Sequence, residues 1–127
     1  MNGDDFLLDT HAAIWWMEGS AKLPAACYRA LRQRGFAYVS LASAWEVAIK
    51  TSLGRLRLAA PFGATVEASG LAFLPLTLAH VEEVGTLPLH HRDPFDRMLV
   101  AQARVENLIL ITGGRRLAAY AVRRFWT

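Results

Sequence analysis

The chain has 127 residues, of which 54% are hydrophobic, and a formal net charge of +3 from 14 Lys and Arg against 11 Asp and Glu. This length predicts a single domain over residues 1–127 with a core that needs no disulfide scaffold. The one cysteine, Cys27, cannot form an internal disulfide, which fits a reducing compartment. With neither a targeting segment nor an apolar run of about 18 residues, the sequence predicts a soluble cytoplasmic protein without a membrane partner.

The basic residues are mostly arginines, since only Lys22 and Lys50 are lysines. Arginine's planar fork suits phosphates and stacks on bases, so the balance mildly favours a nucleic-acid partner. Four arginines near the C-terminus form either a binding patch or a solvated rim: Arg115, Arg116, Arg123 and Arg124.

A short apolar run at residues 6–8 predicts a strand, and residues 12–17 predict a helix. Asp9 then stands at the carboxyl end of the strand, where open parallel sheets bind ligands. The alternative is that Asp9 or Thr10 only caps the helix. Trp15 and Trp16 are adjacent and cannot share one helix face, so we expect one in the core and the other at a partner surface.

Residues 25–34 predict a second helix, and residues 36–39 a second strand. Ser40 or Ser43 then caps a helix through residue 52. Its expected inward residues are Trp45, Ala48, Ile49 and Leu53. Glu46 lies four residues before Lys50, so it either forms an ordinary exposed ion pair or points toward the same crevice as Asp9.

The middle of the chain is less regular, with a short helix expected at residues 62–69 and a strand at 71–74. Thr77 heads a helix through Val84, with Val81 and Val84 facing inward. We expect His80 on this helix to be a surface or packed histidine, because no second histidine stands at ligand spacing on the same helix.

Residues 87–104 concentrate charged side chains at the start of an apolar helix. Asp93 reads as its N-cap, with Pro94 at the first helical position and an apolar face at Leu99, Val100 and Ala103. Asp96 falls in the first turn, so two carboxylates lie near the positive end of the helix dipole and could share a hard cation. The alternative is a variant of the capping box with no further role.

The apolar run at residues 108–111 predicts a strand covered on both faces. Thr112, Gly113 and Gly114 follow at its carboxyl end, then a helix over residues 115–121 and a last strand over 124–126. Strands that alternate with helices predict an α/β fold with a mainly parallel sheet.

With these positions placed, the chain resembles PIN-domain ribonucleases, and among them the VapC-type toxins of type II toxin-antitoxin systems. The resemblance covers nearly the whole chain in five ordered blocks. They are LLDTHAAIWW at residues 7–16, SLASAWEVAIKTSLGRLRL at 40–58, LPLTLAH at 74–80, LPLHHRDPFDRMLVAQA at 87–103 and LILITGGRRLAAYAV at 108–122.

The resemblance implies a three-layer α/β/α fold in which acids from separate elements hold Mg²⁺ or Mn²⁺. The family's acids fall on Asp9, Glu46 and Asp96, with Asp93 an additional acid beside the site. It also implies a small cognate antitoxin as partner and a toxin homodimer. Clustered carboxylates need such a cation, because two unit charges about 4 Å apart repel by roughly 4 kcal/mol at an effective dielectric of 20.

One position departs from the family pattern. The family's fourth strand usually ends in Thr-x-Asp, whereas this chain has Thr112, Gly113 and Gly114, so Gly114 replaces the fourth acid. One cation could still be held, but a second would lose a ligand. Thr112 would position a water or phosphate, the backbone N–H groups of both glycines could form an anion-binding nest, and His90, His91 and Arg92 could touch the RNA backbone.

The first functional hypothesis is therefore a metal-dependent endoribonuclease that acts as a toxin and hydrolyses RNA phosphodiesters. The second, kept open by Gly114, is a catalytically weakened PIN-fold module that binds RNA or an antitoxin. The third is a receiver-like phosphoacceptor domain, which also gathers acids around Mg²⁺. Against it, the C-terminal third has no lysine to contact a phosphoryl group.

Overall fold

The computed structural model describes residues 4–33 and 36–126. A five-stranded sheet in which every neighbouring pair is parallel, in the order β3-β2-β1-β4-β5, forms its centre. In chain order the elements are β1 (Phe6–Leu8), α1 (Thr10–Glu18), α2 (Ala25–Arg32), β2 (Ala37–Ser40), α3 (Leu41–Ser52), α4 (Phe62–Ala68), β3 (Ala72–Leu74), α5 (Leu78–Thr86), α6 (Pro94–Glu106), β4 (Ile109–Ile111), the 3₁₀ helix η1 (Arg115–Ala119) and β5 (Arg124–Phe125).

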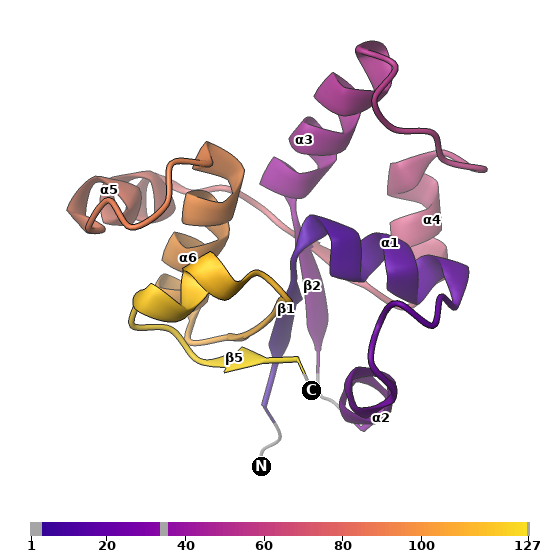
Figure 1. The fold of residues 1–127 in the computed structure, drawn as a ribbon, viewed down its shortest axis with the longest axis horizontal. Coiled ribbons are helices and arrows are strands. Elements are labelled where there is room, and N and C mark those ends of the chain that lie inside the picture. Colours follow the sequence, from indigo (N-terminus) through magenta and orange to yellow (C-terminus); the bar gives the residue numbers. More distant parts are fainter. Residues whose placement is uncertain (1–3, 34–35, 127) are drawn as a thin grey trace.

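Strand β1 shows how the sheet separates two cores. Successive side chains of a strand point to opposite faces. Phe6 and Leu8 enter one cluster with buried residues of α1, α2 and α4, whereas Leu7 enters the other with buried residues of α6. Figure 1 shows α1, α2 and α4 on one side of the sheet and α5 and α6 on the other. The predicted three-layer α/β/α fold with a parallel sheet is confirmed.

The strand order places β1 between β2 and β4, so the direction in which strands are added reverses beside β1. Leu8 is in register with Ile111, and the Asp9 N–H donates to the Ile111 carbonyl over 3.0 Å. Asp9 and Thr112 therefore leave neighbouring strands at the same edge. In open α/β sheets, ligands bind at the carboxyl edge where the strand order reverses.

Four helices begin at side-chain caps that the sequence predicted. Asp9 caps α1, Thr77 caps α5 and Asp93 caps α6, each by accepting from a backbone N–H of the first turn. Of the two candidates for α3, Ser40 is the cap. These caps fix where each helix starts, and with it the position of the acids in or beside the first turns.

The predicted inward face of α3 is wrong. Trp45 is 61% exposed and Leu53 59% exposed, Ala48 is exposed, and only Ile49 is half-buried. The buried residues of α3 are instead Ala42, Ser43, Glu46 and Val47. The apolar pattern is misleading because α3 turns Ser43 and Glu46 toward α1, where the Thr10 hydroxyl donates a hydrogen bond to Glu46. Glu46 therefore does not form an ordinary exposed pair.

The other differences are smaller. On α5, Val81 is exposed and His80 is fully buried, held by Thr77 and Glu106, so the expected inward position of Val81 is wrong and His80 is a packed histidine. The helix expected at residues 115–121 is only the 3₁₀ turn η1. Helix α2 ends at Arg32, and the end expected at residues 34–35 lies outside the described residues. Within the described chain, none of the helices has the length and hydropathy needed to span a membrane.

Candidate active site

Asp9 lies at the carboxyl edge of the sheet, where hydrogen bonds from two partners, Ala12 and Thr112, hold its carboxylate. Its Oδ1 accepts from the Ala12 N–H over 2.8 Å, and its carboxylate also bonds the side chain of Thr112. The Thr112 Oγ1 in turn accepts from the Gly114 N–H over 3.0 Å. Hydrogen bonds thus connect Gly114, in the loop after β4, to Asp9 through the side chain of Thr112. The Gly114 N–H is therefore already used in a hydrogen bond within the protein.

Glu46 reaches this edge from α3. Its Oε1 accepts from the Thr10 hydroxyl over 2.6 Å, and its Oε2 accepts from Lys50 Nζ over 2.7 Å. The residue is 7% exposed, and both carboxylate oxygens keep further lone pairs. Glu46 thus pairs with Lys50, but its carboxylate is buried, and the bond from Thr10 holds it on the side of α3 that faces α1.

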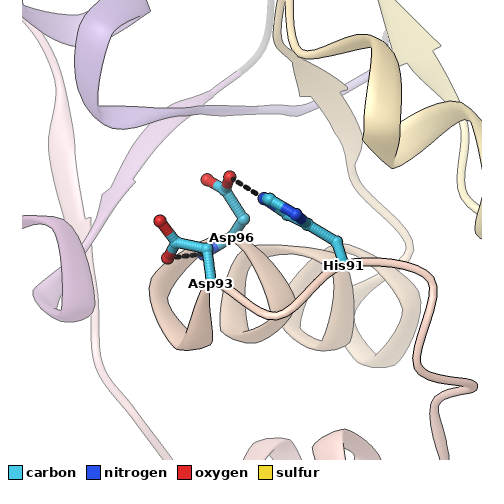
Figure 2. Close-up of side chains that lie close together, drawn as sticks. All are labelled: His91, Asp93 and Asp96. Atoms are coloured by element: carbon cyan, nitrogen blue, oxygen red, sulfur yellow. Dashed lines mark hydrogen bonds and ion pairs between the residues drawn. The ribbon is translucent and has the colours of Figure 1, made fainter.

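Asp93 and Asp96 lie with His91 at the start of α6 (Figure 2). His91 Nε2 lies 2.9 Å from Asp96 Oδ2, and Asp93 Oδ1 accepts from the backbone N–H groups of Phe95 and Asp96. One ligand atom from each of the three residues lies within 4.8 Å of the others, a spacing that one cation could bridge. Asp93 is thus both a helix cap and a member of the acidic group.

The electrostatics link these acids. Burial raises the pKa of Asp9, and the negative charge of Asp96 adds to the rise. Burial also raises the pKa of Asp96, with further contributions from the charges of Asp93 and Glu46, although the hydrogen bond from His91 opposes the rise. The structure therefore places Asp96 within the electrostatic field of the other three predicted acids, whose negative charges disfavour its own.

An open cleft of about 420 Å³ contains two of these acids, Asp9 and Asp96. Its lining residues are Asp9, His11, Trp15, Asp96, Thr112, Gly113, Gly114 and Trp126. A neighbouring groove contains Arg92 together with His90, His91, Asp93 and Arg116. The predicted substrate-binding residues thus divide between the cleft, which holds Thr112 and the two glycines, and the adjoining groove, which holds Arg92.

The tryptophans of α1 differ from the prediction that one of them is exposed. Both are half-buried and pack against the same core. Trp16 stacks on Tyr28 with ring centroids 5.5 Å apart, whereas Trp15 faces the cleft beside Trp126. Both indoles are half-buried because the core packs against both faces of this end of α1.

The roles of three site residues escaped the sequence reasoning, which considered Thr10 only as a helix cap and His91 only as an RNA contact, and did not place Trp126 in the site. Thr10 fixes Glu46, His91 bonds Asp96, and Trp126 forms a cleft wall. Thr10 follows Asp9 directly, and His91 stands five residues before Asp96, so their closeness along the chain was the available signal. Trp126 gave none, because its position depends on the pairing of β5 with β4.

The family model of the PIN domain matches residues 6–123. The chain belongs to the PIN-domain family. A curated PIN-type relative, "Ribonuclease VapC22" of Mycobacterium tuberculosis, is 29% identical over 125 residues, which cover 90% of each chain. By its name, this relative is a ribonuclease.

Two solved structures share the PIN fold. A chain of VapBC2 from Rickettsia felis, bound to a DNA fragment from its promoter, superposes with a TM-score of 0.72 at 12% identity, over 97% of this chain and 99% of that one. A chain of DNA-bound VapBC from Salmonella typhimurium gives a TM-score of 0.70 at 20% identity, over 96% and 97%. At these identities the likeness concerns the fold.

Proposed function

We propose that this PIN domain is a metal-dependent endoribonuclease that acts as the toxin of a toxin-antitoxin pair. The observation that carries the proposal is the meeting of Asp9 and Asp96, from separate elements, in one cleft at the carboxyl edge of the sheet. The curated relative named as a ribonuclease supports the same activity, and a toxin-antitoxin complex from Klebsiella pneumoniae that shares the fold supports an antitoxin partner.

The residues fit a divalent cation with oxygen ligands. Asp9 and Asp96 would hold Mg²⁺ or Mn²⁺ with Glu46 nearby, while Asp93 and His91 complete the adjoining group. The raised pKa values of Asp9 and Asp96 support this assignment, because a cation would relieve the mutual repulsion that contributes to them. Such a cation usually keeps several waters and takes only one or two carboxylates.

When bound, the cation supplies an activated water and offsets charge that develops on the phosphoryl oxygens. The chain's own residues orient the site. Thr112 and the Ala12 N–H hold the Asp9 carboxylate in one direction, and His91 holds that of Asp96. Arg92 and Arg116, which line the same adjoining groove, would contact phosphates next to the reacting one.

Gly114 favours a second candidate function, a PIN-fold module that binds RNA or the antitoxin without efficient cleavage. No carboxylate is present at this position of the cleft to complete the usual four. Under this alternative the remaining acids would hold the cation too weakly or too asymmetrically for turnover.

The experiment is cleavage of a bacterial RNA pool by the purified chain with Mg²⁺ or Mn²⁺, beside an EDTA blank and Asp9→Asn. We expect cation-dependent fragments from the wild type and none from the variant. An inert wild type together with an active Gly114→Asp variant would make the binding module the better account. For the toxin role, co-expression with the cognate antitoxin should yield a stable complex, and the free chain should form a homodimer.

A further inference from the structure

Aromatic side chains form part of the lining of the cleft that contains Asp9 and Asp96. Trp15 and Trp126 have ring centroids 6.0 Å apart at an interplanar angle of 51°, and the His11 ring lies 5.7 Å from Trp15. All three residues line the same cleft as Asp9 and Asp96. The proposed reaction uses none of these rings.

The rings are held in place before any ligand arrives. His11 and Trp15 stand four residues apart on α1, so they share one face of the helix. A Cβ on Gly113 would lie 2.8 Å from Trp126 Cε2, which means that the indole rests directly on this glycine. The Trp126 carbonyl accepts from Cys27 Sγ over 3.2 Å, and burial raises the pKa of that thiol to about 11, so it stays a donor.

The cleft also has more room than a cation needs. A water occupies about 30 Å³ in the liquid, so a cation with six waters takes on the order of 200 Å³. The cleft measures about 420 Å³, within the range of sites for small organic ligands. The cleft therefore has room for a further group beside a hydrated cation.

Resting on the proposed function, we propose that Trp15 and Trp126 form a stacking platform for one unpaired nucleobase of the RNA, adjacent to the phosphodiester that is cut. A base offers a flat π-face to an indole whatever its identity, whereas bases inside a duplex are already stacked. The carboxylate side of the cleft would then face the phosphate, and the rings would face the base.

The test uses a single-stranded RNA hexamer and six copies of it, each lacking one base but keeping the sugar-phosphate backbone. One arm measures single-turnover cleavage by the full chain with Mn²⁺. The other arm measures binding of the same probes to Asp96→Asn in EDTA, which removes both cleavage and one repelling charge. Stacking on one ring typically changes affinity by roughly 5- to 100-fold per base.

The variants are Trp126→Leu, which keeps an apolar side chain without the indole, and Trp126→Phe, which restores a ring. Phe36→Leu is the matched control, because Phe36 is 61% exposed and precedes β2, at the opposite edge of the sheet. Thermal unfolding of each variant verifies folding. The missing-base probes test the wild-type chain as well, so the result stands even if Trp126→Leu does not fold.

We expect one missing base to lower cleavage and binding at least fivefold, Trp126→Leu to abolish this difference, and Trp126→Phe and Phe36→Leu to keep it. Cleavage that is indifferent to every missing base would overturn the platform and leave the ribonuclease standing. Base-dependent binding without any cation-dependent cleavage would overturn the ribonuclease and leave the platform standing.

Discussion

The Thr10 hydroxyl donates a 2.6 Å hydrogen bond to Glu46 Oε1 and so joins α1 to α3 immediately behind Asp9. Both residues are buried, and the Ser43 hydroxyl lies 2.9 Å from the same Thr10 oxygen. A buried carboxylate that loses a donor retains the full cost of its desolvation. The bond therefore positions an acid of the site and stabilises the fold through one contact.

Thr10→Val should consequently destabilise the protein by roughly 1 to 3 kcal/mol, because the isosteric side chain cannot donate to Glu46. Urea unfolding followed by circular dichroism measures the change. Thr10→Ser retains the hydroxyl and serves as the control, with a smaller loss. Equal losses for the two variants would show that the methyl group, and not the hydrogen bond, holds α1 against α3.

Asp9→Asn should raise the stability of the cation-free protein at neutral pH. The pKa of Asp9 in the folded state lies above its ordinary value of 3.8, so folding stability falls as pH rises through the window between the two values. Asparagine has no carboxyl group to ionise, so the variant keeps its stability as pH rises, and its side-chain oxygen still caps α1. The measurement is Tm in EDTA from pH 3 to pH 8, with exposed Asp4→Asn as control. A variant that is less stable than the wild type at pH 7 would contradict this expectation.

The sequence predicted the strands and the helix caps because each depends on local spacing, whereas the choice of acids rested on the resemblance to the PIN-domain family. It failed on the orientation of α3, where the apolar residues Trp45 and Leu53 are exposed and the polar Glu46 is buried. Periodicity assumes that apolar residues face inward, and only the tertiary contact with Thr10 reverses this here. Trp126 could not be predicted as a cleft residue, since strand pairing brings it beside Trp15, 111 positions away.

His91→Ala should weaken binding of Mn²⁺ by about 10- to 100-fold, because a residue that orients a ligand typically contributes this much. His91 Nε2 lies 2.9 Å from Asp96 Oδ2 and fixes that carboxylate. Isothermal titration with Mn²⁺ gives the affinity. The neighbouring His90 is exposed and packs edge-on against Tyr120, so His90→Ala is the control and should bind as the wild type does. Identical affinities for the two variants would remove His91 from the site.

Gly114→Asp should strengthen Mn²⁺ binding and increase the cleavage rate by restoring a fourth carboxylate. The backbone accepts the change, since Gly114 has φ −73° and its new Cβ would lie 3.3 Å from Thr112 Oγ1, a contact that a small shift relieves. Gly114→Asn has the same shape without the charge and should not reproduce the gain. If neither variant binds more tightly, the fourth position lies outside the cation's reach, and if both do, the gain does not depend on the negative charge.

Gly113→Ala should destabilise the protein by about 1 to 3 kcal/mol, the usual cost of overpacking, because the added methyl would meet the Trp126 indole. A methyl added to Gly85 on α5 would have nothing within 4 Å, so Gly85→Ala should be neutral or stabilising by up to about 1 kcal/mol. Urea unfolding compares the two. Equal stability would show that Trp126 moves aside without cost.

The most direct test of the proposed active site is the initial rate of RNA cleavage by the wild type and by Asp96→Asn, each with Mg²⁺ and with EDTA. Asp96 shares its cleft with Asp9 and feels the charges of Asp93 and Glu46. We expect cleavage only by the wild type with Mg²⁺. Equal cleavage by Asp96→Asn, or undiminished cleavage in EDTA, would contradict the assignment of this acidic cleft as the active site.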